Sequence, residues 1–471
     1  MRFIDREDEI KLLEEARELS KRKLYSVCIF GPRRVGKTRL VLEFIRDTDL
    51  YFFVNKDKTS ESLLHEFQET LRERNIIGEL EVIDDWDKFF KVIFERFNGV
   101  IVFDEFQNFK FVDPSVFSTL QKFIDLYENR RNLLIIFCGS LIGLVKKVFS
   151  RKEPLYGRVK RRLRLRPLSI SGVYEMCKEL KLSFETMLKL YSIFGGFPRY
   201  YVAIEDENLE GKPFEEIIEK FFLVENAMFE DEVNMILSIE FGKRKGLYYD
   251  ILYAVATGCR RISEIASFLQ RRQTSITRQL NELIREFEYL TYEEQILGKK
   301  RLLKISHPLI NFWMRFFYRN YSLYVQRNPT FIAKIKREIN AYLGERFEEI
   351  CRELFPKLAP MKYTKIGKHW GKSPLDGSTY EIDILAINEK TNEILFAECK
   401  WAENVDAEKI VKKLAKIAEY VRWNVDDRIE HFAVFAKSFS KRLKDFDGRK
   451  VFCYSLRDLE RALVKTRSTG S

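Results

Sequence analysis

The sequence predicts a multidomain α/β protein. Its 471 residues are enough for about three or four domains, and the 45% that are hydrophobic can build the corresponding cores. Short apolar runs typical of buried strands occur at 24–30 (LYSVCIF), 99–106 (GVIVFDEF) and 133–140 (LLIIFCGS). A segment with helical spacing, RLVLEFIRD at 39–47, comes soon after the first run. This order predicts an open α/β sheet near the N-terminus.

Charge and cysteine content narrow the class of protein. The formal net charge of +12 favours nucleic acid or another acidic partner, although a lysine-rich solvated surface gives the same balance. The seven cysteines include no CxxC pair and the four histidines lie apart from them, which argues against a structural zinc site and favours reduced thiols in the cytoplasm. The charged start MRFIDREDEI predicts no signal peptide, and the longest apolar stretch is too short to cross a membrane.

The first predicted strand leads into a phosphate-binding loop. Residues 31–38, GPRRVGKT, match G-x-x-x-x-G-K-[ST] between a strand and a helix, which is the context that this pattern requires. We expect Lys37 to reach the β- and γ-phosphates and Thr38 to offer its hydroxyl to Mg²⁺. A chance glycine-rich turn is the alternative. The predicted nucleotide-binding residues are Gly31, Pro32, Arg33, Arg34, Val35, Gly36, Lys37, Thr38, Arg39 and Ser140.

Acidic and polar residues end the next two strands. Asp104 and Glu105 close the second apolar run, at the carboxyl end of a strand, where ligands collect in open α/β sheets. We expect Asp104 to hold Mg²⁺ together with Thr38, and Glu105 to orient and polarise the attacking water. Ser140 ends the third run and either senses the γ-phosphate or merely caps the strand. Arg158 is a candidate arginine finger for a neighbouring subunit, with solvated charge as the alternative.

The motifs of the N-terminal half occur in a known order. FIDREDEIKLLEEA, GPRRVGKT, VIVFDEFQ, FCGS, PLYGR and GGFPRYY resemble the archaeal ATPase family of the AAA+ superfamily, which is close to the STAND type. The resemblance implies an ATP-hydrolysing P-loop core at 1–166 and a helical lid at 167–235. A clear second-sensor arginine is missing, and Arg199 is the candidate for its place. The residues implied near the adenine are Phe3, Asp5 and Arg6, and those implied in the lid are Gly195, Gly196 and Pro198.

Residues 236–325 predict a winged helix. YYDILYAVATG, RRISEIASFL and QTSITRQLNELIREF read as helices, and LTYEEQ and LLKISHP read as the strands of a hairpin with a basic turn. The third helix would contact phosphates and base edges, and the hairpin tip would contact phosphates. Alternatively, the module binds protein or packs between the motor and an output domain. The candidate DNA-contacting residues are Arg271, Arg272, Thr274, Ser275, Thr277, Arg278, Lys299, Lys300 and Arg301.

Residues 335–465 predict a second α/β domain. An amphipathic helix at 344–354 is followed by strands at STYEIDILAI and ILFAECKW, a helix at AEKIVKKLAKIAEYV, and strands at HFAVFAKSF and KVFCYSL. Asp383 and Glu398 fall on neighbouring strands, and Glu348 falls on the helix, so their carboxylates could converge on Mg²⁺. Lys400 lies two residues after Glu398, hence on the same strand face, where it would orient the nucleophile or stabilise charge.

This C-terminal pattern also resembles a known fold. Gly344, Phe347 and Glu348, then Asp383, then the E-x-K pair that ends at residue 400 are similar to the PD-(D/E)xK fold of restriction enzymes and Holliday-junction resolvases. The tail also resembles a domain of unknown function that follows this ATPase in many archaeal chains. The resemblance implies a restriction-endonuclease-like α/β domain in which Asp383 and Glu398 hold a metal ion. Solvated strand ends, or a nuclease fold that binds without cleaving, are the alternatives.

The predicted function follows from this domain order. We expect an ATP-binding and ATP-hydrolysing protein that couples nucleotide state to DNA binding, with metal-dependent DNA cleavage as a further activity. The alternative is a STAND-like regulatory switch that acts on a protein partner without nuclease activity. A pure DNA-binding regulator is a third reading, and a homo-oligomer is compatible with each of them.

Overall fold

The computed structural model describes residues 2–242 and 246–465. The described chain forms two compact units. The first comprises the chain up to Ser169 together with Gly196–Val202 and Asn281–Glu288, and the second comprises Ile170–Gly195, Ala203–Leu280 and the chain from Tyr289 onward. Within the described ranges, the search for membrane spans finds no helix that combines the required length and apolar character.

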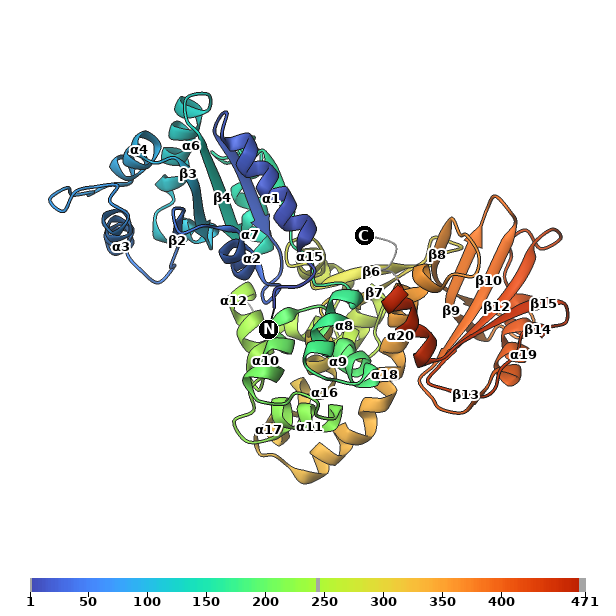
Figure 1. The fold of residues 1–471 in the computed structure, drawn as a ribbon. Coiled ribbons are helices and arrows are strands. Elements are labelled where there is room, and N and C mark those ends of the chain that lie inside the picture. Colours follow the sequence, from blue (N-terminus) through green and yellow to red (C-terminus); the bar gives the residue numbers. More distant parts are fainter. Residues whose placement is uncertain (1, 243–245, 466–471) are drawn as a thin grey trace. The chain divides into compact units, whose positions relative to one another are not determined.

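The first unit is built on a parallel sheet with helices around it (Figure 1). Its strands lie in the order β2-β3-β4-β1-β5, and each neighbouring pair is parallel. The strands are β1 (Tyr25–Phe30), β2 (Leu50–Phe53), β3 (Gly99–Asp104), β4 (Leu133–Gly139) and β5 (Arg161–Arg164). The helices are α1 (Glu7–Ser20), α2 (Lys37–Phe44), α3 (Ser60–Glu73), α4 (Trp86–Arg96), η1 (Phe106–Asn108), α5 (Phe109–Val112), α6 (Ser115–Tyr127) and α7 (Ile142–Val148). The predicted open α/β sheet is therefore confirmed.

The strand order positions the predicted site. Because β4 lies between β1 and β3, the carboxyl ends of these strands lie side by side at one edge of the sheet. Asp85 caps α4 by accepting a hydrogen bond from the Lys88 backbone, which fixes where that helix starts. Phe52, Phe89 and other fully buried aromatic rings then pack between the helices and this sheet face. Burial of such rings holds the strand ends in fixed positions.

A helical segment opens the second unit and continues to a long helix. The helices between residues 170 and 358 are α8 (Ile170–Glu179), α9 (Phe184–Phe194), α10 (Pro198–Asp206), α11 (Phe214–Ile218), η2 (Glu219–Leu223), α12 (Glu232–Phe241), α13 (Gly246–Ala256), α14 (Ile262–Phe268), α15 (Gln273–Arg285), α16 (Pro308–Phe316), η3 (Tyr318–Asn320), α17 (Tyr321–Val325) and α18 (Pro329–Leu358). The antiparallel hairpin β6 (Leu290–Glu294) and β7 (Arg301–Ile305) follows α15. Residue 335, the expected start of the C-terminal domain, lies inside the continuous helix α18.

A mixed sheet completes the second unit (Figure 1). Its order is β14-β15-β12-β10-β9-β8, with β10, β12 and β15 parallel and the other neighbours antiparallel. The expected strands are all present, but β8 at the sheet edge was not predicted. The elements are β8 (Lys365–Lys372), β9 (Thr379–Asn388), β10 (Glu393–Lys400), β11 (Val405–Asp406), α19 (Ala407–Ala418), β12 (Ile429–Ala436), β13 (Phe439–Lys441), β14 (Asp445–Phe446), β15 (Arg449–Tyr454) and α20 (Leu456–Lys465).

Candidate functional site

The phosphate-binding loop connects β1 to α2. A Cβ at Gly31 would lie 2.3 Å from the Leu165 carbonyl oxygen, so the loop can pass this backbone only at a glycine. Gly36 has φ +94°, a left-handed conformation that other residues adopt with strain, and α2 begins at the next residue. The loop therefore has the shape and the helix N-terminus that bind phosphate.

Lys37 is folded onto this loop. Its Nζ donates hydrogen bonds to the carbonyl oxygens of Gly31 at 3.0 Å and Pro32 at 2.8 Å, and the residue is 6% exposed. Burial lowers the pKa of Lys37, whereas the negative charges of Glu105 and Asp104 act in the opposite direction. The ammonium thus lies within the loop, beside the acidic strand end, where a phosphate would supply the counter-charge.

Asp104 organises the predicted magnesium position. Its Oδ2 accepts hydrogen bonds from Thr38 Oγ1 and from the Tyr51 hydroxyl, each at 2.8 Å. Its other oxygen, Oδ1, accepts from the Glu105 backbone at 2.8 Å. The structure therefore brings Thr38 and Asp104 together as expected, and adds Tyr51, which sequence analysis did not identify. Tyr51 reaches Asp104 because β2 lies beside β3, with Phe53 paired to Asp104 across the sheet.

Glu105 is oriented by its neighbours at the same sheet edge. Ser140 Oγ donates to Glu105 Oε2 at 2.7 Å, and the Gln107 side-chain amide donates to the same oxygen. Glu105 has φ 53°, so the backbone turns sharply directly after β3. Ser140 consequently contacts the carboxylate that is expected to orient water, and Gln107 is a second contact that sequence analysis missed.

Arg6 ties the N-terminal segment to the loop. It is 6% exposed, and its guanidinium donates to the carbonyl oxygens of Val35 at 3.1 Å and Arg166 at 2.8 Å. Asp5 accepts from the backbone and the hydroxyl of Ser169 at 3.1 and 2.9 Å. Arg6 of the FIDRE motif thus contacts the phosphate-binding loop, and Asp5 of the same motif contacts Ser169.

The GGFPR motif packs against the same loop. The Leu168 backbone donates to the Gly196 carbonyl oxygen at 2.7 Å, and a Cβ at Gly196 would lie 1.9 Å from the Leu168 oxygen. Pro198 starts α10, and its Cγ lies 3.9 Å from the position of a Cβ at Gly36. Gly196 is thus required because the Leu168 backbone approaches it closely next to the nucleotide site.

Arg158 forms an ion pair within its own unit. Its Nε and Nη2 donate to the two oxygens of Asp125 at 3.1 and 3.0 Å, and Nη1 donates to the Tyr156 carbonyl oxygen at 2.8 Å. The Asp125 side chain is 49% exposed, and a pair in such a position contributes little stability. Arg158 can therefore exchange this partner for a more strongly charged one.

A second group of acidic residues lies in the C-terminal sheet. Carboxylate oxygens of Glu348, Glu381 and Asp383 all lie within 4.8 Å of one another, and they come from α18 and β9. Asp383 Oδ2 accepts from the Cys399 backbone at 2.8 Å. Burial, followed by the charges of Glu348 and Glu398, raises the pKa of Asp383 to about 7. Carboxylates that repel one another in this way favour a shared cation.

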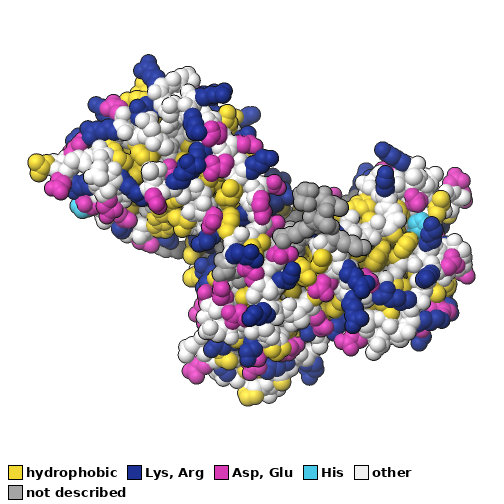
Figure 2. Space-filling view, viewed as in Figure 1, with side chains coloured by type: hydrophobic (Ala, Val, Ile, Leu, Met, Phe, Trp, Pro, Cys, Tyr) yellow, Lys and Arg dark blue, Asp and Glu magenta, His cyan; other side chains and the backbone are white. Residues whose placement is uncertain are grey.

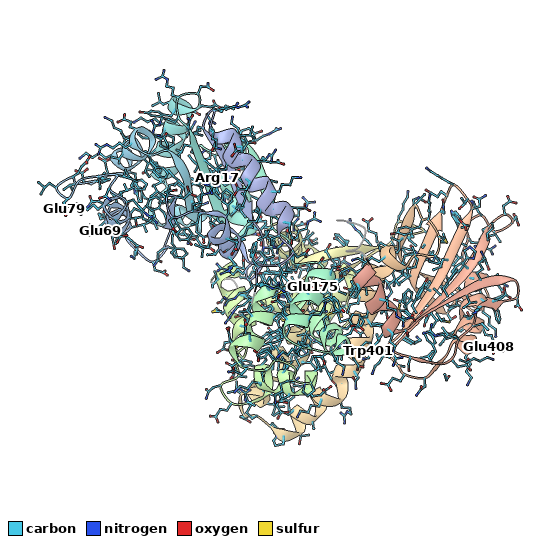
Figure 3. The ribbon with its side chains drawn as sticks, in the orientation of Figure 1. Arg17, Glu69, Glu79, Glu175, Trp401 and Glu408 are labelled. Carbon is cyan, nitrogen blue, oxygen red and sulfur yellow. The ribbon has the colours of Figure 1, made fainter. Side chains whose placement is uncertain are left out.

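Glu398 and Lys400 lie at the end of β10, next to this group. The last paired residues of β9 and β10 are Ile384 and Ala397, so Asp383 and Glu398 follow at the point where the two strands part. Lys400 Nζ lies 2.5 Å from Glu398 Oε1. Trp401, labelled in Figure 3, comes directly after the strand, and its ring centroid lies 5.1 Å from that of Phe347 on α18.

Lys368 contacts this acidic group, which the sequence did not reveal. Its Nζ lies 2.7 Å from Glu348 Oε2 and also contacts the Glu381 carboxylate. It lies at a register irregularity between Gly367 and His369 on β8. Glu381 could have been found from the sequence, because it precedes Asp383 by two residues on one strand and therefore lies on the same strand face.

The predicted DNA-binding module has two different surfaces. The six residues expected to contact DNA from the third helix are all exposed, although Arg271 and Arg272 lie directly before α15, which begins at Gln273. The hairpin, in contrast, contacts the C-terminal sheet, because the Ile296 backbone donates to the Lys368 carbonyl oxygen at 3.1 Å and Leu297 packs against the core of that sheet. At the hairpin tip Lys299 and Lys300 are exposed, while Arg301 stacks 4.0 Å from the Tyr292 ring centroid. Figure 2 shows basic and acidic side chains interspersed on the visible face.

The residues of the first site fit ATP and Mg²⁺. The glycines leave room for phosphate, Lys37 supplies a buried positive charge, and the Thr38 hydroxyl already pairs with the carboxylate that would share the metal. The other predicted nucleotide-binding residues from Arg33 to Arg39 lie on this loop and the first turn of α2.

Comparison with known proteins agrees with this geometry. Residues 3–204 match the family model of an ATPase domain predominantly from Archaea, and residues 313–410 match a family described as archaea bacterial proteins of unknown function. Uncharacterized protein MJECL04 of Methanocaldococcus jannaschii is 28% identical over 452 residues, which are 93% of this chain and 97% of the relative.

A solved structure shares the fold. The Walker-type ATPase paby2304 of Pyrococcus abyssi matches with a TM-score of 0.52 and 22% identity, over 66% of this chain and 96% of its own. The expected resemblance to archaeal ATPases is confirmed by the first family match. Residues 3–204 therefore form a P-loop ATPase domain similar to that family, and residues 313–410 match the second family, of unknown function.

Proposed function

We propose that this ATPase couples its nucleotide state to DNA binding and to metal-dependent DNA cleavage in the C-terminal sheet. The observation that carries the proposal is the convergence of Glu348, Glu381 and Asp383 beside Glu398 and Lys400. The three acids come from α18 and β9, and folding brings these two elements together. Acidic groups gathered in this way at a strand end are suited to a hard cation such as Mg²⁺.

Each residue has a defined part in this proposed cleavage. Glu348, Glu381 and Asp383 would hold the metal, with Glu398 as a further ligand. The bound ion would polarise the scissile phosphate and lower the pKa of its water. Lys400 would then orient the nucleophile and stabilise negative charge on the phosphate, because its ammonium lies at the same strand end as the acids.

The nucleotide site has its own set of roles. Lys37 and the loop backbone would bind the phosphates, Thr38 and Asp104 would hold Mg²⁺, and Glu105 would orient water. Arg158 would complete the site of a neighbouring subunit. These assignments rest on the hydrogen bonds at the ends of β1, β3 and β4.

Exposed residues of α15 and of the segment directly before it are proposed to bind DNA. Arg271, Arg272 and Arg278 can contact phosphates, and the neighbouring hydroxyl side chains can contact either phosphates or base edges. Ile276 and Leu280 are buried on the other side of this helix, so the polar side is the one presented to a ligand. The α13–α15 helices with the β6–β7 hairpin would then act as a winged helix whose third helix enters the groove.

Coupling between the two activities is supported by the course of the chain. The chain passes between the units at 169/170, 195/196, 202/203, 280/281 and 288/289. Within the second unit, Glu353 of α18 accepts from the Tyr191 hydroxyl of α9 at 3.0 Å and from the Ile170 backbone of α8 at 3.3 Å. Helices expected to form the lid are thereby fastened to the helix that carries Glu348.

One observation favours a second function. The hairpin is engaged with the C-terminal sheet through Ile296 and Leu297, as in a module that packs between a motor and an output domain. A STAND-like switch that acts on a protein partner without cleaving DNA would use this arrangement. The two functions differ in whether nuclease activity exists at all.

A cleavage assay separates them. Labelled linear, branched and single-stranded DNA would be incubated with Mg²⁺ or Mn²⁺, with and without ATP, using the wild-type protein and Lys400→Ala. Lys412→Ala is the matched control, because Lys412 pairs with Glu408 on α19 at 2.8 Å. We expect cleavage by the wild type and the control, and loss of cleavage in Lys400→Ala. Intact ATP hydrolysis without any cleavage would favour the switch.

A further inference from the structure

The Glu348, Glu381 and Asp383 group already contains a positively charged side chain. Lys368 Nζ contacts the Glu348 and Glu381 carboxylates, and its side chain is only 10% exposed. An ammonium between two carboxylates makes charge-assisted hydrogen bonds with oxygens that a metal would otherwise use. The lysine therefore stands in the part of the group where a divalent cation would find two of its ligands.

The position of Lys368 is fixed by the hairpin. β8 has an irregular register next to Lys368, and the Ile296 backbone donates to the Lys368 carbonyl oxygen at 3.1 Å. The Gln295 side-chain amide donates to the Trp370 carbonyl oxygen two residues further along the same strand. Polar contacts at the irregularity and two residues beyond it thus hold the edge strand β8 in one conformation.

The hairpin also contacts α18, the helix that supplies Glu348. Glu293 of β6 accepts hydrogen bonds from Arg352 at 2.8 Å and from Arg260 at 2.5 Å. Arg352 lies four residues after Glu348, one turn along α18. The hairpin therefore contacts both elements, β8 and α18, whose side chains form the Lys368–Glu348 pair.

We propose that Lys368 is an internal cation that competes with the divalent metal for Glu348 and Glu381, and that the β6–β7 hairpin holds it there. The inference rests on the proposed metal-dependent site and adds its regulation. Displacement of the hairpin from β8 frees the edge strand, withdraws Lys368 from the carboxylates and raises metal affinity. DNA that binds the exposed lysines of the hairpin tip would act in this direction.

Mn²⁺ binding to the full chain, without nucleotide, tests the proposal. Lys368→Met should bind Mn²⁺ about tenfold or more tightly than the wild type, as expected when two charge-assisted contacts no longer compete. Lys365→Met is the matched control, because Lys365 lies on the same strand but pairs with Glu389 at 2.7 Å. Adding Asp383→Asn to Lys368→Met should abolish the tighter binding, which assigns it to this site.

A second variant tests the part played by the hairpin. Gln295→Ala removes the contact to Trp370 and should tighten Mn²⁺ binding in the same direction, by less than Lys368→Met. Thermal unfolding of each variant checks that the fold is retained. Equal or weaker affinity in Lys368→Met would overturn the inference and leave the proposed metal site standing. Absence of any Mn²⁺ binding that depends on Asp383 would overturn the proposed site as well.

Discussion

Replacing Gly196 with alanine should destabilise the ATPase core. A Cβ at this position would lie 1.9 Å from the oxygen and 2.6 Å from the nitrogen of Leu168, both of which are backbone atoms. The two segments must separate, which breaks the 2.7 Å hydrogen bond between them. Loss of that bond costs about 1 kcal/mol and the overpacking about 1–3 kcal/mol, so we expect about 2–4 kcal/mol in total.

Urea unfolding followed by tryptophan fluorescence, together with an ATP titration, would measure the effect. ATP binding should weaken too, because Pro198 of the same motif abuts the loop at Gly36. Gly78→Ala is the control, since a Cβ there would meet no heavy atom of the described residues within 4 Å, and its effect should stay within about 0.5 kcal/mol. A Gly196→Ala protein as stable as that control would show that the close approach of Gly196 to Leu168 relaxes without cost.

Three further predictions concern catalysis, pH and assembly. Glu105→Gln should reduce the ATP hydrolysis rate by about 10²–10⁴-fold while ATP binding persists, because a neutral amide cannot polarise the attacking water; rate and binding assays measure both. Although burial alone would raise it, hydrogen bonds and charge from Arg352 and Arg260 lower the pKa of Glu293 to about 2 from 4.5. Its stabilisation, on the order of 3 kcal/mol, should thus be complete above about pH 4.5 and disappear as the pH falls toward 2, which thermal melts of wild type and Glu293→Gln would show. If Arg158 completes a neighbouring site, mixing Arg158→Ala with Lys37→Ala protein should restore hydrolysis that neither variant has alone.

Each of these expectations has a clear contrary outcome. Wild-type hydrolysis by Glu105→Gln would remove this carboxylate from the reaction. Parallel melting curves for Glu293→Gln and the wild type between pH 5 and about 2 would show that the ion pairs of this residue add nothing. Persistent inactivity of the mixed subunits, in a sample shown by light scattering to be an oligomer, would leave Arg158 as the partner of Asp125 alone.

The nucleotide site was predictable because its residues are local in sequence. The loop at 31–38 and the acidic strand end need only a strand and the turn after it, and the structure joins Thr38 to Asp104 as expected. Tyr51 was not predictable, because its contact with Asp104 depends on β2 lying beside β3. Which strands become neighbours depends on the packing of the whole sheet, and a short sequence pattern does not contain this information.

The C-terminal site was predicted only in part for the same reason. Glu348, Asp383 and the E-x-K pair were expected from the sequence pattern. Glu381 could also have been found, because residues two apart on a strand share a face. Lys368 lies at an irregularity of an edge strand, where alternation fails, so its direction could be known only from the fold. The hairpin turn was interpreted through its lysines, whereas the apolar Ile296 and Leu297 beside them determine where it packs.

We propose that one chain carries an ATPase site and a separate metal-dependent nuclease site. Two activities measured on the same two variants test this directly. ATP hydrolysis and DNA cleavage would be followed in parallel for Asp383→Asn and Lys37→Ala. We predict that Asp383→Asn abolishes cleavage and keeps ATP hydrolysis, while Lys37→Ala abolishes hydrolysis and removes any effect of ATP on cleavage. Cleavage that survives in Asp383→Asn, or that is absent from the wild type under every metal condition, would contradict the account.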